Sequence, residues 1–455
     1  MYGVLTMLAA AIGLLLLLGA TLGTDECPAS SLSAQQIGQR VAEINTEAGA
    51  EVQRKEFAQA ALLYADAVCL TPNDPQEHYF LGIAQAGGGD MLAARKSFTA
   101  AGRLTPDNPL PLVMLVRANL AMKDVDSAKA ALREIGLRFR DNSEIHATLA
   151  RYLSENQQPE LALAEALRAH DSAMKDPETG IALAVLENSA GAYLDAFRNA
   201  KAIVDEQTLP APARAAAAGV AALSSESLGK RQEAISYLRL SLTLDTQREN
   251  SYLSLAFLYE KALDYRTAVE VLESGVKHLP RSTALLPVLG TDLIRAQKYA
   301  AGITILKKAI EAEPDNGESY LHLADGYRQL TNAAGEIETL RALAKRQADY
   351  PMIHILLARA ILSASEPDAS AALSELQDAE KRNPNDPQIF YLRGKACNVL
   401  GDSGNAEQAL RRAIDLAPGD SGPYYQLARL YQKMGKQELA REMFQRTTAL
   451  QRNER

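Results

Sequence analysis

The side chains best suited to catalysis or metal binding in this chain of 455 residues are six histidines and three cysteines. No HExxH sequence occurs, in which two histidines one helical turn apart would bind zinc. The cysteines form no CxxC pair, and their odd number gives no disulfide framework. The sequence thus contains no recognisable catalytic or metal site, and we predict that the protein is not an enzyme and holds no cofactor or metal.

A phosphate-binding loop is the next chemistry to consider, because Gly87–Gly89 and the following Asp90 read GGGD. A P-loop requires Gly-Lys followed by Ser or Thr, which surround the phosphates. The Gly-Lys pairs that begin at Gly229, Gly394 and Gly435 are followed by Arg, Ala and Gln instead. No GxSxG nucleophile motif is present. We therefore interpret Gly87–Gly89 as a turn between two helices.

Charge and composition narrow the classes of partner. The net charge is −8, and no run of five or more Lys and Arg residues occurs. Nucleic acid is therefore not expected as a ligand. No Asn-x-Ser/Thr acceptor site for glycosylation occurs, which favours an exported bacterial protein over a eukaryotic secreted one.

The N-terminus carries an uncharged apolar run at residues 4–23, with five consecutive leucines inside it. Small residues close this run at Gly19, Ala20 and Gly23, as in a secretory signal peptide, although no basic segment precedes it. About 20 apolar residues also suffice to span a bilayer. We therefore expect residues 1–23 to be either a cleaved signal peptide, giving a periplasmic or secreted protein, or an anchor in the inner membrane.

The elements that carry these side chains follow from one stretch, residues 249–282, whose landmarks recur at a period of 34 residues. With Glu249 as position 1, the landmarks are Tyr252 at 4, Leu255 at 7, Ala256 at 8, Tyr259 at 11, Ala268 at 20, Leu272 at 24 and Pro280 at 32. Apolar residues follow helical spacing in two blocks, which predicts two short helices joined near residues 263–265. Small residues at positions 8 and 20 let the helices approach closely, and the proline ends the second helix.

This pattern resembles the tetratricopeptide repeat. The resemblance implies an all-α fold, a right-handed superhelical α-solenoid of antiparallel helix pairs. One such pair cannot bury its apolar face alone and must stack on its neighbours. The resemblance also implies a class of function, which is the binding of other macromolecules.

Twelve repeats are expected in residues 41–454, after a polar linker and the start of the first helix at residues 24–40. Their ranges are 41–74, 75–108, 109–142, 143–176, 177–214, 215–248, 249–282, 283–316, 317–350, 351–386, 387–420 and 421–454. Position 8 is Ala or Gly in all repeats except the third, which has Val116, and position 20 is Ala or Gly in all except the ninth, which has Glu336. Glu336 follows Gly335, which suggests a slipped or looser ninth repeat.

The repeat pattern also explains several of the reactive side chains. His78, His146 and His354 occupy position 4, where the family packs an aromatic ring, so we predict structural roles for them. Cys69 and Cys397 fall inside repeat helices and are expected to be small packing residues.

In the family, positions 2, 5, 6, 9, 12 and 13 of the first helix line a concave face on which ligands lie. Position 9 is basic in two groups, Arg117 with Arg151 and then Arg359, Lys395 and Arg429. Such residues can pair with carboxylates or phosphates, although scattered arginines are also ordinary solvated residues.

The middle of the array is uncharged in the columns for positions 5 and 9, so the central groove is expected to be apolar. The apolar and aromatic residues expected to contact a partner are Leu253, Phe257 and Leu321 in the middle and Tyr79, Tyr391 and Tyr425 towards the ends. The tyrosines would also permit stacking of a sugar ring.

These observations predict a non-enzymatic scaffold of the bacterial cell envelope that binds partner proteins or peptides, including ones with acidic segments, along the concave face. Two alternatives stay open. One is a component of a machine for polysaccharide export or cell-wall assembly. The other is a structural oligomer joined through its terminal hairpin. A membrane would be contacted only through residues 1–23, if they stay uncleaved.

Overall fold

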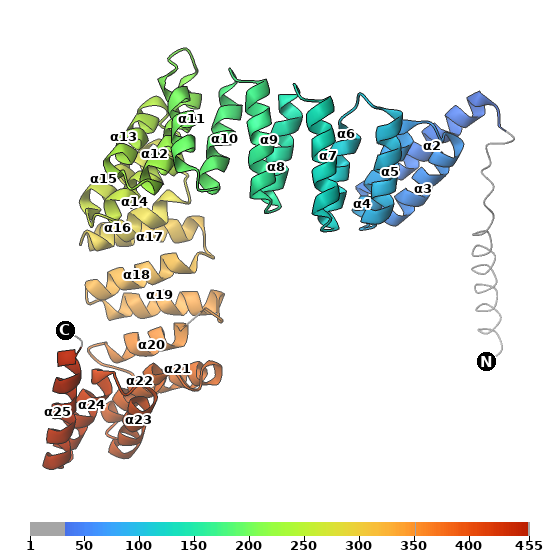
Figure 1. Ribbon diagram of the computed structural model, residues 1–455. Helices are drawn as coiled ribbons and strands as arrows, with labels where there is room; N and C mark the ends of the chain where they lie inside the picture. Colours follow the sequence, from blue (N-terminus) through green and yellow to red (C-terminus); the bar gives the residue numbers. More distant parts are fainter. Residues whose placement is uncertain (1–31, 351, 454–455) are drawn as a thin grey trace, which may run out of the picture. The chain divides into compact units, whose positions relative to one another are not determined.

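The computed structural model describes residues 32–350 and 352–453, and within them every regular element is an α-helix. The helices, named α2 to α25, follow one another as antiparallel hairpins (Figure 1). The chain divides into two compact units, residues 1–199 and 200–455, and the division lies inside α11 (Tyr193–Asp205). Within each unit the predicted all-α solenoid of helix pairs is confirmed.

The first unit contains α2 (Ala34–Gln53), α3 (Phe57–Leu70), α4 (Pro75–Gly87), α5 (Met91–Leu104), α6 (Leu110–Ala121), α7 (Val125–Arg138), α8 (Ser143–Glu155), α9 (Pro159–Ser172) and α10 (Pro177–Ser189). The second unit contains α12 (Ala211–Ser227), α13 (Arg231–Leu244), α14 (Glu249–Glu260), α15 (Tyr265–His278), α16 (Leu285–Arg295), α17 (Tyr299–Ala312), α18 (Gly317–Gln329), α19 (Ala333–Arg346), α20 (Ile353–Leu362), α21 (Ala369–Arg382), α22 (Pro387–Val399), α23 (Ser403–Leu416), α24 (Ser421–Lys433) and α25 (Gln437–Asn453). Helices with even numbers are the first helices of the repeats, and helices with odd numbers are the second.

The turn inside most of the hairpins depends on one backbone conformation. In the described part of the chain, eleven of these turns have a residue with positive φ at repeat position 15, namely Gly89, Gly191, Gly229, Gly401, Gly435, Lys55, Lys123, Gln157, Leu263, Gln297 and Thr331. Glycine adopts this conformation without steric cost, and other residues do not. Gly89 has a φ of 87° directly after α4, so the segment Gly87–Gly89 is the helix-ending turn that we predicted.

Aspartates begin five of the second helices in the described part of the chain. The side chains of Asp90, Asp124, Asp264, Asp368 and Asp402 each accept a hydrogen bond from the backbone N–H three residues later, at 2.9 to 3.1 Å. These bonds satisfy N–H groups that have no partner inside the helix. The local sequence therefore fixes where these five second helices start.

Close packing inside the hairpins depends on the small residues at positions 8 and 20. In the pair α16 and α17, a Cβ atom on Gly302 would lie 2.9 Å from the carbonyl oxygen of Gly290, and one on Gly290 would lie 2.5 Å from Cγ of Leu306. Both distances are shorter than a real Cβ atom tolerates. At the same positions of the preceding pair, Ala256 and Ala268 are fully buried. The predicted role of these two positions is confirmed.

The ninth pair differs from the others in residue type but not in register. Helix α19 begins at Ala333, which is repeat position 17, as it is for the starts of α15 and α17. Glu336 is buried in the first turn of α19, and burial raises the pKa of its carboxyl. The predicted slip of this repeat is wrong, because α19 starts at the same repeat position as α15 and α17. The carboxylate of Glu336 is favoured at this position by the positive end of the helix dipole and by the charges of Arg328 and Arg359.

Two of the position-4 histidines form pairs with glutamates on the second helix of their own repeat. His146 is fully buried, and its Nδ1 lies 2.6 Å from Oε2 of Glu165. Nδ1 of His354 lies 2.8 Å from Oε2 of Glu375. These contacts replace the packing of an aromatic ring, so the predicted structural role is confirmed for both histidines.

The cysteines behave differently from one another. Cys397 is a buried free thiol that packs in the core of the last two hairpins, as predicted. Cys69 is disulfide-bonded, so its predicted role as a packing thiol is wrong. An odd number of cysteines excludes complete pairing of all of them, but it does not exclude one disulfide. The third cysteine, Cys27, lies outside the described residues.

The apolar run at residues 4–23 also lies outside the described residues. Among the helices that are described, none is both long and apolar enough to cross a membrane. Of the expected linker, the last residues already belong to α2, whose N-cap Ser33 accepts a hydrogen bond from the backbone N–H of Gln36.

Candidate ligand-binding groove

In the first unit the predicted basic residues Arg117 on α6 and Arg151 on α8 are exposed. The guanidinium carbon of Arg117 lies 5.0 Å from the ring centroid of Tyr152, on the next first helix, which is a cation–π distance. Tyr79 is half-buried, and its ring centroid lies 5.9 Å from that of Phe98. Burial raises the pKa of Tyr79. Its ring therefore packs α4 against α5.

In the second unit three cations occupy position 9 of successive first helices, α20, α22 and α24. Arg359 and Arg429 are exposed, and the ammonium of the half-buried Lys395 lies 5.8 Å from the ring centroid of Tyr391. Burial raises the pKa of Tyr391. Tyr425 on α24 is 42% exposed, so it offers more of its ring than Tyr391 does.

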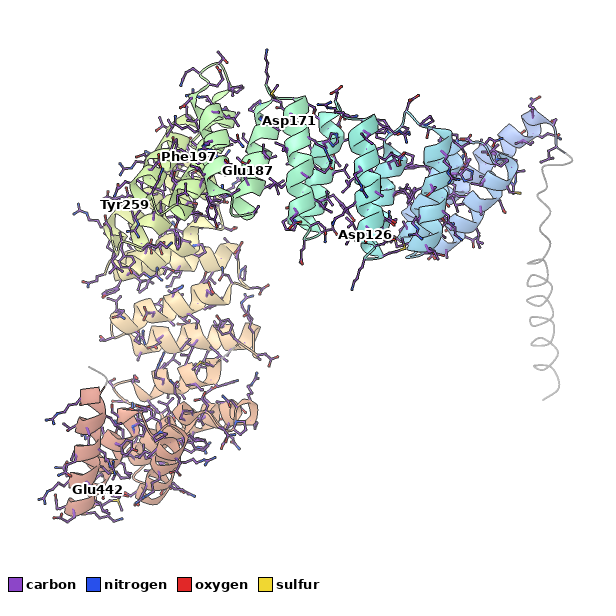
Figure 2. All side chains as sticks on the ribbon, viewed as in Figure 1. Asp126, Asp171, Glu187, Phe197, Tyr259 and Glu442 are labelled. Atoms are coloured by element: carbon purple, nitrogen blue, oxygen red, sulfur yellow. The ribbon has the colours of Figure 1, made fainter. Side chains whose placement is uncertain are left out.

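A series of ion pairs joins the first helices of the sixth, seventh and eighth repeats. Each pair links position 12 of one repeat to position 13 of the next. The Nζ atom of Lys261 lies 2.9 Å from Oε1 of Glu226, and Nη1 of Arg295 lies 3.0 Å from Oε2 of Glu260. Nη2 of Arg239, on the second helix α13, donates a hydrogen bond of 2.6 Å to the hydroxyl of Tyr259 on α14. Figure 2 labels Tyr259. The two ion pairs thus link successive first helices, and the hydrogen bond links α13 to α14.

A cavity of about 320 Å³ opens where this series ends, between α14, α16 and α18. Its lining is Leu253, Phe257 and Glu260 from α14, Pro287, Val288, Thr291, Asp292 and Arg295 from α16, and Asn316, Glu318, Ser319 and His322 from the start of α18. The structure thus brings the predicted residues Leu253 and Phe257 together. Leu321 instead packs against the core of α18 to α20. The prediction of an uncharged, apolar centre is wrong, because five ionisable side chains line this cavity.

Asp292 is the most unusual of these side chains. It is fully buried, and its Oδ1 lies 3.5 Å from the same Nη1 atom of Arg295 that contacts Glu260. Its Oδ2 has no hydrogen-bond partner among the described residues. Burial and then the charge of Glu260 raise the pKa of Asp292 to about 7, although Arg295 acts in the opposite direction. Near neutral pH this group is therefore divided between the acid and the carboxylate.

Two further polar groups border the cavity. Ser319 is fully buried, and its Oγ has no hydrogen-bond partner among the described residues. Burial and the charge of Arg295 lower the pKa of His322 below its usual range, so this imidazole is neutral at pH 7. The described residues, those of this cavity included, contain no group of three or more His, Cys, Asp and Glu that could hold a metal ion.

The sequence prediction missed Asp292, Arg295, Glu260 and His322 because it used only the columns for positions 5 and 9. A signal was present at position 10, which reads Ala50, Ala84, Ala118, Tyr152, Leu186, Ser224, Leu258, Asp292, Gly326, Ala360, Ala396 and Leu430. Asp292 is the one charged residue in a column that packing otherwise fills with uncharged side chains. A residue that opposes the packing pattern of its column is typical of a functional site.

Models of the tetratricopeptide repeat match the chain at residues 85–152, at residues 288–351 and 355–421, and at residues 409–442. The matched segments coincide with helix pairs in both units. The chain belongs to the tetratricopeptide repeat family. Proteins of this family bind other proteins or peptides, and their repeat fold is typically a scaffold without catalysis.

This tetratricopeptide repeat chain is similar to cellulose synthase operon protein C of Pseudomonas fluorescens (strain SBW25), with 24% identity over 381 residues. The match covers 80% of this chain but 27% of that protein, so the chain spans about a quarter of the length of its relative. Among solved structures, yeast Tom70 is 15% identical with a TM-score of 0.35, covering 91% of this chain and 92% of that one. MamA is 21% identical with a TM-score of 0.33, covering 36% of this chain and 96% of that one.

Proposed function

We propose that this tetratricopeptide repeat protein is a scaffold that binds partner proteins or peptides along its first helices. The observation that carries the proposal is the cavity between α14, α16 and α18, beside which Phe257 is 48% exposed. Leu223, at the same repeat position on α12, is 53% exposed. Exposed apolar side chains beside a few convergent polar groups are typical of a binding site.

The charge of the last repeats supports a partner that contains an acidic segment. Arg359, Lys395 and Arg429 repeat at one position of successive first helices. Rows of cations steer an acidic partner into the groove, and added salt weakens this attraction. The acidic segment would thus bind next to the central cavity, within the same unit.

A role in polysaccharide export or cell-wall assembly is the second candidate. The similarity to cellulose synthase operon protein C favours it, because that match extends over 80% of this chain. The exposed ring of Tyr425 offers a face on which a sugar would stack. On this alternative, the groove would hold either a glycan or a protein of the assembly machine.

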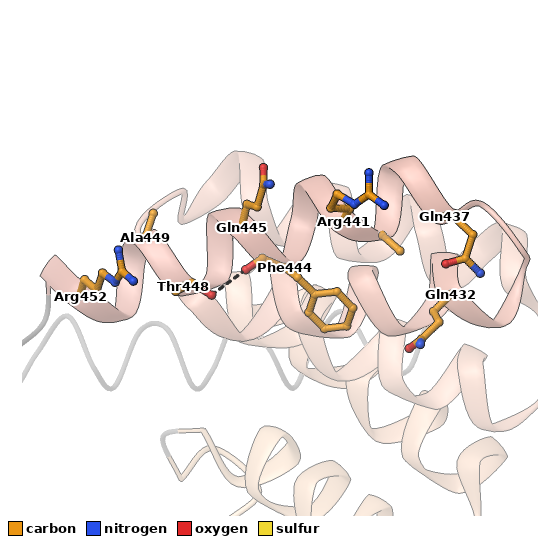
Figure 3. A pocket seen from close by; sticks show the side chains of 9 residues that line it. Gln432, Gln437, Arg441, Phe444, Gln445, Thr448, Ala449 and Arg452 are labelled. Carbon is orange, nitrogen blue, oxygen red and sulfur yellow. Dashed lines mark hydrogen bonds between the residues drawn. The ribbon is translucent and has the colours of Figure 1, made fainter.

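An oligomer joined through the terminal hairpin receives less support. A cavity of about 560 Å³ borders α25, and Figure 3 shows its side chains. Its lining includes Gln437, Arg441, Gln445 and Arg452, with the ring of Phe444 among them. This lining is largely polar, whereas a permanent dimer would require an apolar face.

We further propose that the protein acts outside the cytoplasm, either free in the periplasm, secreted, or attached to the inner membrane through residues 4–23. The disulfide at Cys69 supports this location, because disulfides persist in oxidising compartments. N-terminal sequencing of the native product tests it. A start shortly after Ala20 to Gly23 supports cleavage, intact Met1 in the membrane fraction supports an anchor, and a cytoplasmic product contradicts both.

Site-specific photocrosslinking in cells tests the scaffold proposal. A photoreactive p-benzoyl-phenylalanine replaces Phe257 in the groove and, as a matched control, Leu439 on α25, which is 37% exposed. We expect crosslinks from position 257 to other proteins and none from position 439. Crosslinks from position 439 to a second copy of the chain would favour the oligomer. An absence of protein crosslinks from position 257, together with binding of cello-oligosaccharides to the purified chain, would favour the polysaccharide alternative.

A further inference from the structure

The cavity between α14, α16 and α18 contains more negative than positive charge. Glu260, Asp292 and Glu318 face one fully charged cation, Arg295. Arg295 is already shared between Glu260 and Asp292, and Tyr265 covers its guanidinium at 5.7 Å from the ring centroid. The free protein therefore has no second cation in the cavity to balance the remaining carboxylate.

The same cavity has two buried polar atoms with unused hydrogen-bonding capacity. They are Oδ2 of Asp292 and Oγ of Ser319, and both residues are fully buried. A buried polar atom without a partner destabilises the fold. Both atoms lie beside an open cavity and not inside a closed core, so a ligand in the cavity can supply the missing donor.

We propose that this cavity binds the primary ammonium group of a partner segment, either a lysine side chain or an amino terminus, at Asp292. This inference rests on the proposed scaffold function and names the partner chemistry at the centre of the groove. The ammonium would donate to Oδ2 of Asp292 and to Oγ of Ser319. The aliphatic stem of a lysine would lie along Leu253, Phe257 and Pro287.

The geometry favours an ammonium over other donors. A guanidinium binds a carboxylate best through both oxygens at once, but Oδ1 of Asp292 is already in contact with Arg295. An ammonium is a compact group with three donors, and one free oxygen suffices for it. A sugar hydroxyl could donate to the same atom, but it would leave the excess negative charge in place.

Binding of this ligand is coupled to pH, because only the carboxylate form of Asp292 attracts a cation. The groups that face Asp292 are Glu260 from α14, Arg295 from its own helix and His322 with Glu318 from α18. Lower pH protonates Asp292, whose pKa is about 7, and then His322, and both changes make the cavity more positive. Affinity for an ammonium is therefore expected to be lower at pH 5.5 than at pH 8.

The test starts with selection of random dodecapeptides displayed on phage against the full purified chain. A selected peptide is then synthesised with a fluorophore, and its Kd is measured by anisotropy. Two peptide variants separate the two sources of the ammonium, one with lysine replaced by norleucine and one with an acetylated amino terminus. We expect one of them to bind the parent chain at least about tenfold more weakly.

Protein variants show whether the ammonium binds at Asp292. In the Asp292→Asn variant, the parent peptide and its weakened variant should bind with nearly the same Kd, and the Kd should lose most of its pH dependence. Glu260→Gln should reduce both the difference in Kd and its pH dependence. The control Asp378→Asn removes a carboxylate of the second helix α21 that pairs with Lys381 outside the cavity, and it should change neither.

Each remaining result has a definite meaning. Peptides that bind equally well without any ammonium, or that bind Asp292→Asn as tightly as the parent chain, overturn the inference but leave the scaffold function standing. Failure to select any binding peptide contradicts the scaffold function itself and the inference with it. Binding of cello-oligosaccharides that depends on Asp292 would assign the cavity to a sugar and would also overturn the inference.

Discussion

Replacing Asp292 by Asn is expected to stabilise the protein at alkaline pH. The carboxyl is fully buried, and its pKa is raised from 3.8 to about 7. In this pH interval the folded chain holds a proton that the unfolded chain has lost, so stability falls as the pH rises from about 4 to about 7 and stays at the lower level above it. At about 1.4 kcal/mol for each pH unit, the full interval corresponds to roughly 4 kcal/mol.

The asparagine variant lacks this titration but keeps the shape of the side chain and an oxygen that can accept from Arg295. The free energy of unfolding of the variant relative to the parent should therefore rise by roughly 2 to 3 kcal/mol between pH 5 and pH 8. This rise is the larger part of the change expected over the whole titration of Asp292. Such a gain would mean that the carboxylate is kept at a cost in stability, which is common at functional sites.

Urea unfolding at pH 5 and pH 8, followed by far-UV circular dichroism, measures the difference. Repeat arrays can unfold in segments, so hydrogen exchange of the peptides covering α16 locates the effect. The control is again Asp378→Asn, whose carboxylate is partly exposed and paired with Lys381. If Asp292→Asn changes stability by the same amount at both pH values, the side chain is not protonated by burial and this reasoning is refuted.

Three further predictions follow from the packing, the charges and the cysteines. Gly302→Ala should lower the free energy of unfolding by about 1 kcal/mol or more, because the clash of the new Cβ with the Gly290 carbonyl outweighs the better helix propensity of alanine. Gly49→Ala, where a Cβ has nothing within 4 Å, should instead raise the free energy of unfolding by roughly 0.5 to 1 kcal/mol. Equal melting temperatures for the two variants would contradict this. Joint reversal of Arg359 and Arg429 to Glu should slow association with an acidic partner at low salt while circular dichroism stays unchanged, and an unaltered association rate would mean that these arginines are ordinary solvated residues. Thiol titration of the unreduced, urea-unfolded chain should find one free thiol, that of Cys397, and a value of three would exclude the disulfide.

Local chemistry explains why most of the architecture was predictable. A proline, an N-cap aspartate and a glycine turn act within a few residues, so Gly89 and Asp90 define the end of one helix and the start of the next without help from distant segments. The small residues at positions 8 and 20 record contacts that recur in every hairpin, as Gly290 and Gly302 illustrate. The slip of the ninth repeat was predicted wrongly because the sequence alone does not show that the helix N-terminus and neighbouring arginines stabilise the buried carboxylate of Glu336.

The sequence by itself determined the helix pairs and their turns. It also determined that Arg359, Lys395 and Arg429 recur at one repeat position, because a period of 34 residues returns each position to the same side of successive helices. Only the tertiary structure decided that Glu260, Asp292 and Arg295 share one cavity with His322. These side chains come from three different repeats and from four different repeat positions, so no single column contains them. Their pKa values depend on burial and on mutual distance, which exist only after neighbouring repeats have stacked.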